Sequence, residues 1–188
     1  KVLLSFEYGP STKPEIHPMS IAILKHMFAK NIKVYATALW PDGNFMSTEA
    51  FEEVNKEYFK DRTIICSAST HHNEEEIFAN LHINLKKRIP NLVTIIIPRH
   101  IERTQEISNQ LKKLNLNVHT SEPKKKIKKK IDIYLVNSYG KTKSFFVECK
   151  NVFLGGSIAK RGGQNPLEAT RYGCNILHGP NISNFKEI

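Results

Sequence analysis

Two pairs of glycines near the C-terminal end have the residue types of a phosphate-binding loop. The first pair follows the apolar run Val152–Leu154, and the second comes before a helical stretch that begins at Pro166. Glycine lets the backbone approach a phosphate closely, and the first free amides of a helix point toward it. Lys160 and Arg161, between the pairs, add positive charge. We therefore predict an anion site at Gly155, Gly156, Ser157, Gly162, Gly163, Gln164 and Asn165.

Glu168 and the end of another apolar run extend this predicted site. Glu168 follows Asn165, the expected helix cap, by about one turn, where a carboxylate can accept hydrogen bonds from ribose hydroxyls. A surface glutamate without a ligand is the alternative interpretation. Arg99 and His100 follow Leu92–Ile97, and open α/β sheets bind ligands at the carboxyl ends of their strands. Arg99 is thus the expected second phosphate contact.

A group of histidines and acids, His71-His72 and Glu74 to Glu76, invites a metal interpretation. No zinc-binding spacing such as HExxH accompanies it. Acids in the first turn of a helix are explained by the helix dipole. We therefore predict no metal site and no bound cofactor, and the sequence identifies no catalytic residue.

Short β-branched runs alternate with longer amphipathic stretches along the whole chain, which is the rhythm of βαβ units. Several runs are apolar without alternation, as in parallel sheets covered on both faces. We predict an α/β fold, a Rossmann-like parallel sheet with helices on both faces. The expected strands are Val2–Phe6, Ile32–Leu39, Thr63–Ser67, Leu92–Ile97, Leu116–His119, Ile131–Val136, Asn151–Leu154 and Asn175–His178. The expected helices are Pro18–Lys30, Ser47–Tyr58, Asn73–Arg88, Ile101–Leu114, Lys141–Cys149 and Pro166–Tyr172.

The chain is strongly basic, with 28 Lys and Arg against 18 Asp and Glu and a net charge of +10 over 188 residues. Such a surface attracts phosphates, whether of a nucleotide, a nucleic acid or an anionic membrane. Six lysines gather in Lys124–Lys130, where a solvated loop is the simpler interpretation. A non-catalytic basic module that binds nucleotides or nucleic acid is therefore a second hypothesis.

The lengths of the apolar runs and the spacing of the cysteines favour a cytoplasmic location. The longest apolar runs fall far short of the roughly 20 residues that cross a bilayer, and no secretory signal opens the chain. Cys66, Cys149 and Cys174 are widely spaced and odd in number, so we expect buried thiols in a reducing cytoplasm and not disulfides. Because the chain begins at Lys1 and stops in mid-pattern at Ile188, we expect a fragment, truncated at its C-terminus.

Several motifs together resemble the nucleotide-sugar-binding half of 3-deoxy-D-manno-octulosonic acid (Kdo) transferases, over Thr63–Ile188. The string Gly155–Glu168 is the most specific of them. The others, in chain order, are Ser69-Thr70-His71 with Glu74-Glu75, Pro98-Arg99-His100 with Glu102-Arg103, Tyr139-Gly140, His178-Gly179-Pro180-Asn181 and Asn184-Phe185. The glycine that is usual before the acids is replaced by Asn73, and the segment around Gly140 lacks the family's Gly-Glu-Leu pattern.

The resemblance implies the C-terminal domain of a GT-B glycosyltransferase, which is inverting and independent of metal. Its donor would be CMP-Kdo and its acceptor a lipid A precursor in lipopolysaccharide biosynthesis. Gly140 would belong to the donor site, with His71 and Glu74 in its wall. The expected place is the cytoplasmic face of the inner membrane of a Gram-negative bacterium, with peripheral contact to anionic lipid.

Residues 1–60 do not match the acceptor half of that family and are too few to form it. We expect a βα extension that either adds strands to the same sheet or forms an incomplete partner lobe. Residues 61–188 are expected to form the nucleotide-sugar-binding domain, and a second lobe would then supply the acceptor site and the catalytic base.

Overall fold

The computed structural model describes residues 1–121, 127, 130–140 and 142–187, without the side chains of residues 44, 51, 52, 55 and 121. Residues 1–60 with Ile127 form one compact unit, and residues 61–121 with 130–187 form a second. Each unit has its own cluster of buried apolar side chains. Most of the lysine run Lys124–Lys130, which was predicted to be a solvated loop, lies outside the described residues.

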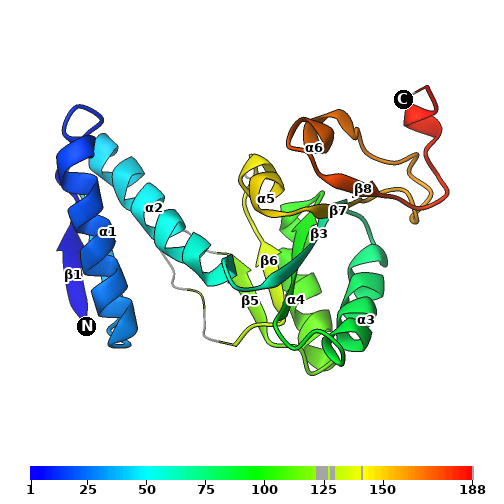
Figure 1. Cartoon of the computed structure of the whole chain (residues 1–188), viewed down its shortest axis with the longest axis horizontal. Coiled ribbons are helices and arrows are strands. Elements are labelled where there is room, and N and C mark those ends of the chain that lie inside the picture. The colour runs from blue at the N-terminus through cyan, green and yellow to red at the C-terminus, as the bar shows by residue number, and fades with distance from the viewer. Residues whose placement is uncertain (122–126, 128–129, 141, 188) are drawn as a thin grey trace. The chain divides into compact units, whose positions relative to one another are not determined.

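The first unit is a small α/β layer. Strands β1 (Val2–Ser5) and β2 (Val34–Thr37) pair in parallel as a two-stranded sheet. Helices α1 (Lys13–Ala29) and α2 (Pro41–Lys56) lie side by side, and a 3-10 turn, η1 (Glu57–Phe59), follows (Figure 1). Their shared core includes Phe6, Leu24, Phe28 and Met46. Of the two alternatives predicted for residues 1–60, the one in which these strands extend the main sheet is wrong, because β1 and β2 form a separate two-stranded sheet.

Both helices of the first unit begin earlier than predicted. α1 begins at Lys13 and continues through Pro18, because burial of its inner face outweighs the poor helix propensity of proline. α2 begins at Pro41, where a proline suits the first helical position, although Trp40-Pro41-Asp42-Gly43 has the composition of a turn. Ser47, where this helix was predicted to begin, is buried inside it.

The second unit contains a six-stranded parallel sheet in the order β5-β6-β4-β3-β7-β8 (Figure 1). This confirms the predicted Rossmann-like class. The strands are β3 (Thr63–Thr70), β4 (Leu92–Pro98), β5 (Val118–Ser121), β6 (Ile133–Val136), β7 (Asn151–Leu154) and β8 (Asn175–Leu177). The helices are α3 (Glu74–Lys86), α4 (Thr104–Lys113), α5 (Thr142–Glu148) and α6 (Leu167–Arg171), with 3-10 turns η2 (Ile101–Arg103) and η3 (Ser183–Phe185).

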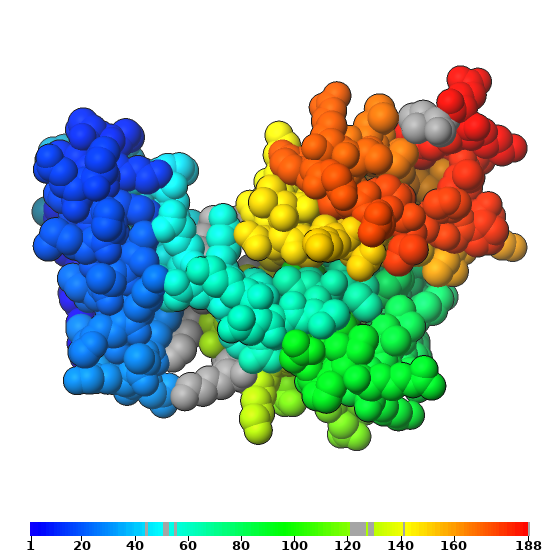
Figure 2. All heavy atoms as spheres, in the orientation of Figure 1, coloured from blue at the N-terminus to red at the C-terminus, as the bar shows by residue number. Residues whose placement is uncertain are grey.

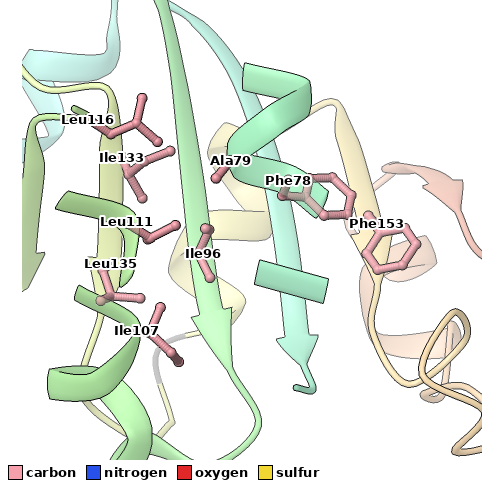
Figure 3. Close-up of a cluster of buried hydrophobic side chains, with 9 residues drawn as sticks. All are labelled: Phe78, Ala79, Ile96, Ile107, Leu111, Leu116, Ile133, Leu135 and Phe153. Atoms are coloured by element: carbon pink, nitrogen blue, oxygen red, sulfur yellow. The ribbon is translucent and has the colours of Figure 1, made fainter. Parts of the chain in front are cut away.

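The main core lies between one face of this sheet and helices α3 and α4. Phe78 from α3 meets Phe153 from β7 with ring centroids 4.6 Å apart, and Leu111 from α4 packs toward β6 (Figure 3). Alternate strand residues point to the other face. There Cys66 neighbours Cys149 and Cys174, and all three cysteines are buried and free, as predicted.

The sheet has its topological switch point between β3 and β7. The chain passes from β3 to β4 on one side of β3, and it later places β7 on the other side. In open α/β sheets, ligands bind outside the carboxyl ends of the strands at such a point. The loops that follow β3 and β7 are therefore the part of the fold where a site is expected.

No helix in the described ranges combines the length with the apolar composition that crossing a bilayer requires.

Candidate functional site

Gly155 brings the backbones of β3 and β7 together at the switch point. Its N–H donates to the carbonyl of Ala68 at 2.8 Å. A Cβ atom at this position would lie 2.2 Å from the carbonyl oxygen of Ser69, so only glycine fits. Gly156 then turns the chain with φ +73°, in the left-handed region that glycine adopts without strain.

The carboxylate of Glu74 spans this junction. It is fully buried, and one oxygen, Oε2, accepts from the N–H groups of His71 and Gly156, each at 2.8 Å. The other oxygen, Oε1, accepts from Ile158 at 3.0 Å and Ala159 at 3.1 Å. The negative charge is thus stabilised by four backbone donors. These amides are engaged with Glu74, so the first glycine turn offers a ligand fewer free amides than the sequence predicted.

Asn73, the residue before Glu74, has the backbone conformation that this arrangement requires. Its φ is +73°, so it occupies the left-handed conformation that asparagine tolerates better than other residues with a side chain. Asparagine therefore fulfils the backbone role expected of the glycine that it replaces.

The neighbouring acid Glu75 is also fully partnered. Its buried carboxylate accepts from the Thr70 hydroxyl at 3.0 Å and pairs with Arg103 at 3.0 Å. The hydrogen bonds and the ion pair of Glu74 and Glu75 account for their burial. Their carboxylate oxygens therefore have little capacity left for a metal ion.

The second glycine pair forms a different kind of turn. Gly162 and Gly163 have φ values of +82° and +78°, and the N–H of Gly163 donates to the carbonyl of Gly156 at 3.1 Å. Asn184 supports the turn by donating through its side-chain amide to Arg161 and Gly163 carbonyls, at 3.1 and 3.3 Å. Within the described part of the chain, no acceptor takes the amides of Gly162, Gln164 and Asn165. Of these three residues, Gln164 lines the pocket beside the turn.

A pocket of about 450 Å³ lies beside this turn. Ser157, Gly163 and Gln164 line it, and its apolar wall includes Ile176, Ile182 and Phe185. In Figure 2 the segments that build it, from the glycine loop to the C-terminal end, form one orange-to-red surface of the second unit. The volume lies within the range of small-ligand sites.

Ser157 holds the opposite side of this pocket in place. Its hydroxyl donates to the Leu154 carbonyl at 2.7 Å and accepts from the N–H of Gly179 at 2.8 Å. Its own carbonyl accepts from the Asn181 side chain at 2.9 Å. The motif His178-Gly179-Pro180-Asn181 is thereby fastened to the glycine loop.

His71 connects this region with the end of β4. Its ring lies 6.0 Å from that of His100 and nearly perpendicular to it, and its Nε2 atom is 3.5 Å from the side-chain nitrogen of Gln164. Burial is the largest cause that lowers the pKa of His71, and Glu74 opposes it while His100 and Arg161 add to it. The lowered pKa favours the neutral form of the His71 imidazole.

Arg161 was expected to add positive charge to the site, although it was not among the predicted site residues. A Cβ atom at Gly156 would lie 3.3 Å from both the Arg161 and the His71 side chains, so these two side chains flank the turn. No carboxylate among the described residues forms an ion pair with Arg161. Its place between the glycine pairs was the available sequence signal.

The structure leaves other predicted residues outside the pocket lining. Glu168 is exposed on α6, which has only five residues and so provides a weak dipole. Asn165 does cap this helix, since its Oδ1 accepts from the N–H of Leu167 at 2.9 Å. Arg99 is exposed at the end of β4, and Gly140 is exposed with φ +75° and nothing within 4 Å of a Cβ there.

Known proteins resemble the chain over the region that carries these features. No family model matches it. The 3-deoxy-D-manno-octulosonic acid transferase of Haemophilus influenzae is 33% identical over 129 residues, which are 69% of this chain and 30% of that protein. The transferase of the same name from Rickettsia felis is 34% identical over 139 residues, 73% of this chain and 30% of that protein. The chain thus spans about a third of the length of these relatives.

A solved structure matches both the fold and the sequence. It is the C-terminal CMP-Kdo binding domain of WaaA from Acinetobacter baumannii, with a TM-score of 0.67, 26% identity and coverage of 76% of this chain and 75% of that chain. The parallel sheet and its switch-point loops therefore have the fold of the C-terminal domain of a GT-B glycosyltransferase. The chain is similar to one part of the Kdo transferases, and the resemblance predicted from its motifs is confirmed.

Proposed function

We propose that residues 61–188 bind CMP-Kdo as the donor half of a Kdo transferase. The pocket of about 450 Å³ beside the second glycine turn carries this proposal, because Gln164, whose backbone amide is unengaged, lines it together with an apolar wall. The phosphate of a nucleotide sugar can accept hydrogen bonds from backbone amides, and its rings can pack against the apolar wall. The similarity to a CMP-Kdo binding domain supports this donor in particular.

The phosphate is bound by the amides of Gly162, Gln164 and Asn165 together with Arg161. Gly155, Gly156 and Ser157 shape the loop, and Glu74 keeps it rigid through its four hydrogen bonds. Arg99 and His100 approach the ligand from the end of β4, with Gly140 beyond them, and His71 forms part of the wall. Glu168 accepts hydrogen bonds from the ribose. Backbone donors and cations neutralise a single phosphate without a metal ion.

The proposed reaction is an inverting displacement in lipopolysaccharide biosynthesis. A hydroxyl oxygen of a lipid A precursor forms a bond to the anomeric carbon of Kdo, and the bond from that carbon to the phosphate oxygen of CMP breaks. CMP leaves with the electron pair, and a base takes the hydroxyl proton. This chain stabilises the leaving group, whereas a further lobe supplies the base and the acceptor. Contact with the cytoplasmic face of the inner membrane would give access to that acceptor.

Calorimetric titration of the full chain with CMP tests this proposal. We expect saturable binding that is selective over purine mononucleotides, and Glu168→Ala should weaken it by roughly tenfold, as the loss of hydrogen bonds to a ribose implies. Glu106→Ala removes an exposed acid from α4 and should leave binding unchanged. If the parent chain does not bind CMP, or if both variants behave alike, the donor site is assigned wrongly.

The competing basic module predicts another outcome in the same titration. Binding through counterion release falls steeply with salt and does not depend on the base. Its main carrier in the sequence, Lys124–Lys130, lies mostly outside the described residues, and the similar proteins are named as transferases. Base-independent binding that disappears at high salt would favour the module over the transferase.

A further inference from the structure

The first unit contains polar atoms that its own fold leaves without partners. His17 on α1 is only 4% exposed, yet its Nε2 atom has no hydrogen-bond partner. The Oε2 atom of Glu49 on α2 is likewise buried and unpartnered. A buried polar atom without a partner costs free energy, so its persistence calls for an explanation such as an ion.

These atoms face each other across the two helices. Glu49 and Glu53 are four residues apart on α2, a spacing that puts both carboxylates on one face of the helix. The Nε2 of His17 lies 3.9 Å from Oε1 of Glu53. One ligand atom from each of the three residues lies within 4.8 Å of the others. Modest side-chain rotation brings such atoms to the roughly 2.0–2.2 Å distances of a bound zinc ion.

The surrounding residues orient these atoms as an outer shell would. Tyr8 and the Nδ1 atom of His17 are 2.6 Å apart, so a proton on Nδ1 can be donated to the phenol oxygen. This tautomer leaves the lone pair of Nε2 free, as in metal-bound histidines whose other nitrogen donates to an oxygen. Lys13 pairs with the Oε1 atom of Glu49, which leaves Oε2 as the available ligand.

A groove gives access to this cluster. It has a volume of about 640 Å³ and is lined by Lys13, His17, Lys25 and Glu53, among others. Both lysines carry their own acidic partners, Lys13 pairing with Glu49 and Lys25 with Glu57. The local positive charge is thus already compensated, and the carboxylate of Glu53 remains for a cation.

We propose that His17, Glu49 and Glu53 bind a divalent transition-metal ion that links α1 to α2. One imidazole nitrogen and two carboxylate oxygens suit zinc and its neighbours in the first transition row better than magnesium, which prefers oxygen alone. The ion would complete a small unit whose sheet has only two strands, because domains of this size often need such a staple. No spacing motif joins His17 to the two acids, which is why the sequence predicted no metal here.

The test is a calorimetric titration of the full, chelator-treated chain with Zn²⁺, repeated in the presence of excess Mg²⁺. We expect one tight equivalent per chain that Mg²⁺ does not displace. Glu53→Gln should weaken it at least tenfold, whereas Glu15→Gln, an exposed acid on α1, should not. Glu53 is itself exposed, so its substitution spares the core.

Two further measurements keep the proposal open to refutation. Zn²⁺ should raise the thermal unfolding midpoint reported by Trp40 fluorescence in the parent chain but not in Glu53→Gln. Co²⁺ should give an absorption spectrum without the intense bands of thiolate ligation. If Glu53→Gln retains the tight equivalent, if the parent binds none, or if thiolate bands appear, His17 and the two acids form only a charge cluster and the proposal is overturned.

Discussion

Two buried clusters of polar side chains, one in each unit of this chain, are satisfied to different degrees. In the second unit, Glu74 and Glu75 are buried, and backbone amides and Arg103 satisfy them. In the first unit, the Nε2 of His17 and the Oε2 of Glu49 are buried without partners. A buried carboxylate is stable when the fold supplies its donors, whereas the unpartnered atoms of the first cluster retain capacity for a further ligand.

Within the second unit, the two glycine turns differ in whether their backbone amides are already hydrogen-bonded. The first glycine turn is held by Glu74, and the second turn keeps the amides of Gly162, Gln164 and Asn165 unengaged. A preorganised loop beside free donors is what anion binding requires. The first glycine turn, which Glu74 holds, therefore positions the second.

The largest expected effect is that of Glu74→Ala. Four backbone N–H groups would lose their acceptor, and we expect the free energy of unfolding to fall by about 4 kcal/mol, measured by urea denaturation. Glu76→Ala removes an exposed acid from the same helical turn and should cost less than about 1 kcal/mol. Equal losses in the two variants would mean that Glu74 does not hold the loop.

A core substitution in each unit tests their independence. Leu24→Ala and Leu111→Ala each remove a buried leucine side chain, one from each core, and each should cost about 3 kcal/mol. Trp40, the single tryptophan, reports on the first unit. We expect Leu24→Ala to shift the fluorescence transition and to spare CMP binding, and Leu111→Ala to do the reverse. A single shared transition would contradict the division.

A smaller effect is expected from the buried His82 on α3. Its Nδ1 lies 2.9 Å from the Thr94 hydroxyl, and burial lowers its pKa below the ordinary 6.5, although Asp132 opposes this shift. The unfolded chain then binds the proton more readily, so stability should decrease as pH falls below about 6.5. Urea denaturation at several pH values should give a flatter profile for His82→Gln. An unchanged profile would show that another group is responsible.

The smallest effect concerns Asn73, whose φ of +73° suits glycine best. Asn73→Gly should leave stability unchanged or raise it by up to about 1 kcal/mol, whereas Asn73→Ala should lower it by about 1 kcal/mol. Thermal unfolding of the three chains measures both differences. An alanine variant as stable as the glycine variant would rule out the left-handed conformation.

Much of the fold could be predicted because local patterns carry it. The strand Asn151–Leu154 has the predicted bounds. The other observed strands differ from the predicted ones only by small shifts at their ends. The helix starts in the first unit were less predictable, since Pro18 and Gly43 are poor helix residues whose neighbours nevertheless pack. A Cβ at Gly43 would lie 1.8 Å from the Phe6 carbonyl, so close packing explains that glycine.

The place of the glycine loops in the fold was predictable, and their contacts were less so. Gly155 and Gly163 lie where the pattern of strand, glycine and helix indicated, at the carboxyl edge of the sheet. Their amides do not share one role, because Glu74 reaches the first turn from a position 82 residues away from Gly156. Nothing in the spacing of the glycines contains that information.

The sequence by itself therefore determined the order of the elements, the parallel class of the sheet, the resemblance to Kdo transferases and the position of the glycine loops. These properties depend on side-chain periodicity and on backbone freedom over a few residues. Only the tertiary structure decided which amides Glu74 occupies, that the first two strands form their own sheet, and that His17 meets Glu49 and Glu53. Hydrogen bonds and ion contacts depend on distances between atoms from remote segments, and the folded chain alone sets those distances.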